Sequence, residues 1–158
     1  MTDLPEELDG HCLLTLGNGD LFLVGGYSMN VANTSYHYSM QDEQWSQKAD
    51  MIQARHRFGC GRVTNPTTGK EEVLVTAGWG NDFEQLSTTE IYTAEDDSWR
   101  SGKPLPMALS KPASLQYEDT LLILGGGNEH GCLDKIYEVI FKSCYCYLDC
   151  YNSGMSTI

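Results

Sequence analysis

Histidine and cysteine are the side chains in this sequence best suited to metal binding or catalysis. Four histidines and six cysteines occur among the 158 residues. Several of them gather towards the C-terminal end, and these are His130, Cys132, Cys144, Cys146 and Cys150. Their spacing lacks the two-residue spacer that is typical of paired zinc ligands. We therefore expect no metal site and no cofactor.

Short catalytic motifs are also missing from the sequence. It contains no Gly-x-Ser-x-Gly, no His-Glu-x-x-His and no phosphate-binding loop. The remaining histidines, His11, His37 and His56, are far apart, and the carboxylates are scattered as on a solvated surface. We therefore expect that the chain is not an enzyme.

One dense basic cluster stands out, formed by Arg55, His56 and Arg57. Arginine is suited to bidentate recognition of carboxylates, so the cluster favours a site for an acidic partner. The alternative is structural, with an arginine that caps or bridges neighbouring units of the fold. The sequence leaves both interpretations open.

Composition restricts the class of partner. Ten Lys and Arg face 22 Asp and Glu, for a net charge of −12, so nucleic acid and anionic membrane surfaces are repelled. No apolar run reaches the roughly 18 residues of a membrane helix, which argues against membrane insertion. The acidic N-terminus is not a signal peptide, which favours the cytoplasm. An extracellular location stays open if the N-terminus is truncated.

The elements that must position these residues repeat along the chain. Three strand-forming runs, 21–26, 73–78 and 121–126, each end in a pair of small residues. The last residues of the runs lie 52 and then 48 positions apart. Turn signals such as 17–20 separate short strands, and reading strands between the landmarks gives four per unit. Four short antiparallel strands repeated about every 50 residues are typical of β-propeller blades.

A second landmark is a tyrosine that precedes a tryptophan by seven positions. Tyr38 and Trp45 form the first such pair, and Tyr92 and Trp99 form the second. In the third unit Tyr137 occupies the tyrosine position, but Cys144 stands where tryptophan is expected.

Together, the small pair, the tyrosine–tryptophan spacing and the period resemble the kelch repeat over about residues 4–139. The resemblance implies an all-β fold, a partial kelch-type β-propeller of about three four-stranded antiparallel blades with the last blade incomplete. The small pair then permits close approach of backbones, and the aromatic residues pack between blades. The motif positions that it implies are Gly25, Gly26, Tyr38, Trp45, Ala77, Gly78, Tyr92, Trp99, Gly125, Gly126 and Tyr137.

The resemblance also predicts the organisation of the chain. The expected parts are the end of a preceding blade, two full repeats, a partial repeat and an unpatterned tail, at residues 1–9, 10–55, 56–111, 112–139 and 140–158. Propellers typically close with about four to eight blades, so three blades do not close a ring. We expect a fragment of a longer protein. The alternative is an assembly in which two chains complete one ring.

The function implied by the resemblance is a non-catalytic protein–protein interaction module. In this family the loops at one end of the propeller often contact partners, and the expected binding residues are Arg55, His56, Arg57, Trp79, Asn81, Asp82 and Phe83. The alternative for Trp79 is that it folds back on its own blade. The alternative for the whole chain is part of a secreted or enzymatic propeller, similar to the copper oxidases, whose site lies in missing blades.

Cys12 and Cys60 occupy corresponding positions on the first strands of neighbouring units. One expectation is that each is a small buried residue. The other is that they pair in a secreted parent, which requires Cα atoms within about 7 Å.

Overall fold

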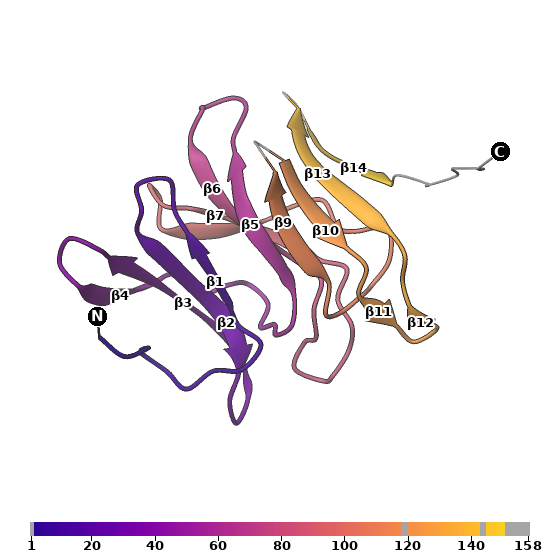
Figure 1. Ribbon diagram of the computed structural model, residues 1–158, viewed down its shortest axis with the longest axis horizontal. Coiled ribbons are helices and arrows are strands. Elements are labelled where there is room, and N and C mark those ends of the chain that lie inside the picture. The colour runs from indigo at the N-terminus through magenta and orange to yellow at the C-terminus, as the bar shows by residue number, and fades with distance from the viewer. Residues whose placement is uncertain (1, 118–119, 143–144, 151–158) are drawn as a thin grey trace.

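The chain folds into three four-stranded antiparallel sheets, arranged as successive blades (Figure 1). The computed structural model describes residues 2–117, 120–142 and 145–150, and from residue 140 onward only the backbone is described. In this part of the chain every regular element is a strand. A search of the same residues for a helix able to cross a membrane finds none. The all-β prediction is confirmed.

Blade 1 has its strands in sequence order, and the expected hairpin turn at residues 17–20 joins the first two. Its strands are β1 (Cys12–Thr15), β2 (Leu21–Tyr27), β3 (Val31–Ser39) and β4 (Gln44–Lys48). Blade 2 follows the same order with β5 (Gly59–Thr64), β6 (Glu71–Thr76), β7 (Thr89–Thr93) and β8 (Ser98–Ser101). The first strands of successive blades contact one another, so they form the inner side of the row of blades.

Blade 3 is more complete than the sequence suggests. Its strands are β9 (Ala113–Tyr117), β10 (Thr120–Leu124), β13 (Ile136–Lys142) and β14 (Tyr145–Cys150). A small hairpin, β11 (Gly127–Asn128) and β12 (Gly131–Cys132), extends the connection between β10 and β13.

The expected incomplete last blade, with an unpatterned tail at 140–158, is therefore wrong for residues 140–142 and 145–150. Strand β14 pairs with β13 along its whole length, although this segment contains no tryptophan. Strand pairing depends on backbone groups, and β13 would otherwise present an open edge. Tyr137 lies opposite Cys150, while Cys144 is outside the described residues.

The tyrosine–tryptophan landmark has a direct structural cause. Tyr38 lies opposite Trp45 across β3 and β4, and Tyr92 lies opposite Trp99 across β7 and β8. The ring centroids are 4.9 Å apart in the first pair and 5.3 Å apart in the second. The spacing of seven is thus the length of a hairpin that places the two rings side by side.

The small pairs lie within β2 and directly after β6 and β10, and the first residue of each pair has a left-handed backbone. Gly25, Ala77 and Gly125 have φ values of 59°, 66° and 62°. A Cβ atom on the following glycine would lie 2.8 Å from the His56 carbonyl oxygen at Gly78. This close approach of backbones explains the second glycine, while Ala77 adopts a conformation that costs a non-glycine residue about 1 kcal/mol.

Two seams join the blades. The first seam, between blades 1 and 2, is a cluster with four aromatic residues, Phe22, Phe58, Tyr92 and Trp99. The second seam, between blades 2 and 3, is mainly aliphatic, with Leu74, Ile91, Leu121, Ile123 and Val139 at its centre.

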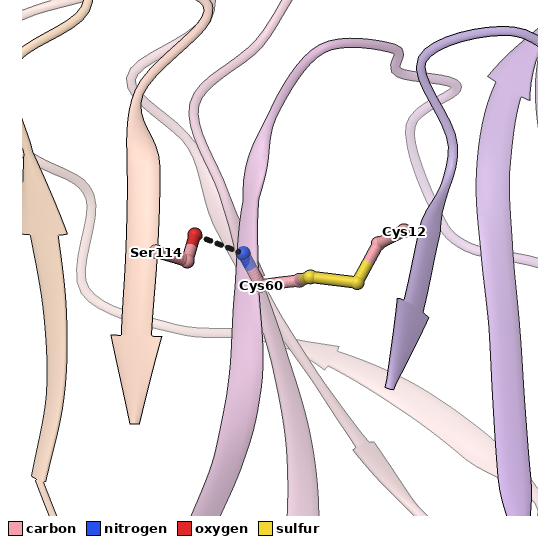
Figure 2. The surroundings of a disulfide bond; sticks show 3 residues. All are labelled: Cys12, Cys60 and Ser114. Carbon is pink, nitrogen blue, oxygen red and sulfur yellow. Dashed lines mark hydrogen bonds between the residues drawn. A yellow bond between two sulfur atoms is a disulfide. The ribbon is translucent and has the colours of Figure 1, made fainter. Parts of the chain in front are cut away.

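A disulfide crosses the first seam, joining Cys12 of β1 to Cys60 of β5 (Figure 2). The two Cα atoms are 6.5 Å apart, and the bond closes a loop of sequence separation 48. The backbone N–H of Cys60 also donates to Ser114 Oγ of β9, 3.0 Å away (Figure 2). The expectation of two separate small buried residues is therefore wrong, because matched positions on inner strands come within bonding distance.

Candidate functional site

A repeated backbone contact builds one end of the inner strands. In each blade, the residue after the small pair exchanges two hydrogen bonds with the chain that enters the first strand. The three pairs are Asp9 with Tyr27, His56 with Trp79 and Ser110 with Gly127, at N–O distances of 2.8–3.0 Å. These pairs tie the entry to each blade to the loop that leaves its second strand.

The next residue of each entry segment links neighbouring blades. Gly10, Arg57 and Lys111 all have left-handed backbones, with φ of 62°, 51° and 54°. The Arg57 N–H donates to the Gly10 carbonyl oxygen at 2.7 Å, and the Lys111 N–H donates to that of Arg57 at 2.8 Å. The result is a short chain of hydrogen bonds across all three blades that brings two cationic side chains to the inner end.

A depression of about 410 Å³ lies at this end. Residues from the segments that enter the three blades, the last residue of β2 and the loop after β6 line it, namely Asp9, Tyr27, His56, Arg57, Trp79, Phe83 and Lys111. Three aromatic side chains and two cations therefore share one surface with a single carboxylate. Such a surface suits a ligand that combines negative charge with apolar groups.

The carboxylate is already engaged by one of the cations. Arg57 Nη2 lies 3.1 Å from Asp9 Oδ2, and both side chains are well exposed. The hydrogen bond from Arg57 lowers the pKa of Asp9 below its ordinary value. Lys111 has no such ion pair among the described residues.

His56 lies deeper, with 7% of its surface exposed. Its ring lies beside that of Tyr27, with centroids 5.3 Å apart. Burial, together with the positive charge of Arg57, lowers the pKa of His56 below its ordinary value. The neutral imidazole is therefore favoured near neutral pH.

Arg55 does not belong to this surface. Its side chain is fully buried, and Nη2 lies 2.7 Å from Glu90 Oε1 of β7. Its Nη1 donates to the carbonyl oxygens of Ala77 and Thr88 at 2.9 and 3.0 Å. Arg55 thus bridges blade 1 to blade 2, which is the structural alternative. Its predicted role as a partner-binding residue is wrong because Glu90, 35 positions away, draws it inward.

The loop after β6 contributes two of its four predicted residues to the depression. Trp79 is half-buried and tied by its backbone to His56, while Phe83 is 66% exposed. Asn81 and Asp82 are exposed outside the lining residues. The loop therefore joins the basic cluster through Trp79 and Phe83.

Three lining residues were not identified from the sequence: Asp9, Tyr27 and Lys111. A signal was present for Tyr27, because an aromatic residue directly follows the small pair in both of the first two repeats. Asp9 and Lys111 carry no such signal. They reach the depression through backbone pairing and through the left-handed turn.

The residues that the structure describes contain no group of three or more His, Cys, Asp or Glu able to hold a metal ion. The side chains of Cys144, Cys146 and Cys150 lie outside this description.

Similarity to known proteins agrees with this architecture. The chain is 32% identical to Kelch-like protein 36 of Bos taurus over 131 residues, which are 79% of this chain and 20% of the relative. The chain is a kelch-repeat protein. The kelch relationship extends to Kelch-like protein 34 of Homo sapiens, 29% identical over 80% of this chain and 21% of the relative. Beta-scruin of Limulus polyphemus is 27% identical over 76% of this chain and 14% of its own length.

The kelch chain thus spans about one fifth of the length of the first curated relatives that it matches. No family model matches it. The solved structure titled "Structure of YjhT" superposes with a TM-score of 0.78 at 12% identity, covering 95% of this chain and 53% of the other. This likeness concerns the fold, a partial kelch-type propeller.

Proposed function

We propose that this chain is a non-catalytic protein-binding module, and that its axial depression receives an acidic segment of the partner. The observation that carries the proposal is the convergence of the basic cluster and the loop after β6. Arg57, His56, Trp79 and Phe83 line one depression, with Lys111 as a second cation. Aromatic and arginine side chains are frequent anchors at protein interfaces.

The proposal also holds that this chain is part of a larger propeller with more blades. Propellers close with about four to eight blades, and the residues that the structure describes form three. A rigid set of sheets that carries loops at one end is suited to partner recognition. The kelch-repeat names of the curated relatives support this interpretation.

The test is binding of short, terminally blocked peptides to the purified chain. One peptide has adjacent glutamates flanked by leucines. The control peptide has glutamines in place of the glutamates. We expect the acidic peptide to bind more tightly, and the combined change Arg57→Gln and Lys111→Gln to weaken it by about tenfold or more. The salt dependence of binding should decrease in the same variant.

A charge-matched control is available at the far end of β5. Arg62→Gln with Lys70→Gln removes two cations that pair with Glu71 and Glu95 outside the depression. This variant should keep the binding of the acidic peptide. Asp9→Asn should have the opposite effect on affinity. It removes the carboxylate that pairs with Arg57, so the acidic peptide should bind more tightly. Equal affinity for both peptides, or equal weakening by both double variants, refutes the proposal.

A further inference from the structure

The His56 side chain is a buried polar group without a protein partner. Neither ring nitrogen has a hydrogen-bond partner in the described residues, and both nitrogens are buried. His56 is also one of the residues that line the depression. Leaving such a group unsatisfied costs about 1–3 kcal/mol. Because His56 lines the depression, a ligand bound there can supply the missing partner once the atoms that cover the two nitrogens move aside.

The surrounding structure holds the ring in place for this purpose. The backbone of His56 exchanges two hydrogen bonds with Trp79, at 3.0 and 2.9 Å. Tyr27 covers one side of the ring. A ligand therefore meets an imidazole that is already oriented.

The charged side chains near the His56 ring decide which kind of ligand the depression favours. Burial is the main cause that lowers the pKa of His56 and disfavours a protonated ring. The charges of Arg57 and Lys111 act in the same direction, whereas that of Asp9 favours the protonated ring. Tyr27, another titratable group, lies beside the ring. A carboxylate placed in the depression would add negative charge beside His56 and accept a hydrogen bond from it, which reverses this balance in favour of the imidazolium.

We propose that His56 anchors a carboxylate of the bound partner, and that binding is accompanied by uptake of a proton from solvent at this ring. The inference rests on the proposed function and specifies how the same depression recognises its ligand. Binding should then tighten as the pH falls through the pKa of His56 in the complex. It should stop tightening below the lower pKa of His56 in the free chain.

The experiment is isothermal titration calorimetry of the chain with the glutamate–leucine peptide, in two buffers of different ionisation enthalpy. We expect a buffer-dependent heat that corresponds to proton uptake. Affinity should rise by about threefold to tenfold between roughly pH 8 and pH 6, where an imidazole titrates but the peptide carboxylates do not.

Matched variants assign the proton to the ring. His56→Gln retains hydrogen-bonding groups but cannot titrate, so it should bind the peptide without proton uptake. His56→Phe retains a ring beside Tyr27 but removes the hydrogen bond, so it should bind more weakly at every pH. His37→Gln changes a histidine that is already paired with Asp20 at 3.0 Å, and it should leave the pH dependence intact.

The outcomes separate this inference from the function on which it rests. Peptide binding that is independent of pH, or a pH dependence that survives in His56→Gln, overturns the role of His56 and leaves the proposed function standing. Failure of the acidic peptide to bind at any pH refutes both. Thermal unfolding of each variant shows whether the fold is retained.

Discussion

The two seams between blades are held by different kinds of interaction. The first combines tilted aromatic rings in contact, with Phe22 and Tyr92 centroids 4.8 Å apart, and directional hydrogen bonds. Trp99 Nε1 donates to the Ala49 carbonyl oxygen at 2.9 Å, while the Ala49 N–H donates to Asp97 Oδ1 at the same distance. A disulfide and the buried Arg55–Glu90 pair reinforce it.

The second seam depends on shape. A Cβ atom on Gly61 would meet the side chain of Leu121, and one on Gly59 would lie 2.8 Å from Ile123 Cδ1. Glycines on β5 thus make room for aliphatic side chains from β10. The same repeat pattern therefore supports two kinds of interface. The first seam combines aromatic contacts with hydrogen bonds, and the second is closely packed and apolar.

The largest effect should come from the tryptophan of the first seam. Trp99→Ala removes a ring that is 9% exposed together with its hydrogen bond, and should cost about 3–5 kcal/mol in the free energy of unfolding. Trp45→Ala changes the equivalent, half-buried residue of blade 1 and should cost less, about 1–2 kcal/mol. Urea denaturation measures both. Equal costs would remove the distinction between the two residues.

Reduction of the Cys12–Cys60 disulfide should have the next largest effect. The bond closes a loop of sequence separation 48, so its loss should cost about 2–4 kcal/mol. Thermal unfolding with and without reductant measures the loss, and Cys12→Ser with Cys60→Ser should reproduce it. Non-reducing peptide mapping detects the bond directly. If the midpoint of thermal unfolding does not change with reductant, the disulfide does not stabilise the first seam.

The second seam is tested by adding volume. Gly61→Ala forces Leu121 to move and should cost about 1–3 kcal/mol. If close packing stabilises this seam, Gly61→Ala should lower the free energy of unfolding clearly less in a Leu121→Ala background, because the contact with Leu121 is then absent. A double-mutant cycle in urea gives the coupling. Additive effects would show that packing at this contact is not what holds blades 2 and 3 together.

The smallest effect should be the acid response of Asp97. The Ala49 N–H and the Tyr92 hydroxyl lower the pKa of Asp97 below its ordinary value. The folded pKa is depressed, so this contribution is complete above the ordinary value of about 3.9 and is lost as the pH falls through the folded pKa. Because Asp97 is exposed, we expect about 0.5–1 kcal/mol between wild type and Asp97→Asn near neutral pH. The difference should disappear in acid, and a constant difference would contradict this cause.

The blades could be predicted from the sequence because their landmarks are local. Tyr92 and Trp99 are seven positions apart in one hairpin, and they lie opposite one another across β7 and β8. Strand β14 could not be predicted, since pairing with β13 requires backbone groups and no particular side chain. A search for tryptophan therefore misses it.

The candidate site was predictable only in part, for a similar reason. His56 and Arg57 stand out by residue type, but so does Arg55, and only its distant partner Glu90 shows that it is buried. Lys111 reaches the depression because its backbone repeats the left-handed turn of Arg57. Lysine carries no sequence signal for such a turn, unlike Gly10 at the equivalent position.

The backbone pairs at the inner end of the blades also affect the energetics of docking. Trp79 is tied on one side to His56 and on the other to Gln85, so the loop that carries it is ordered before a partner arrives. Little conformational entropy is then lost when a ligand binds, and docking proceeds nearly as a collision of rigid bodies. Changes of the partner sequence should therefore alter its residence time on the propeller far more than its rate of association.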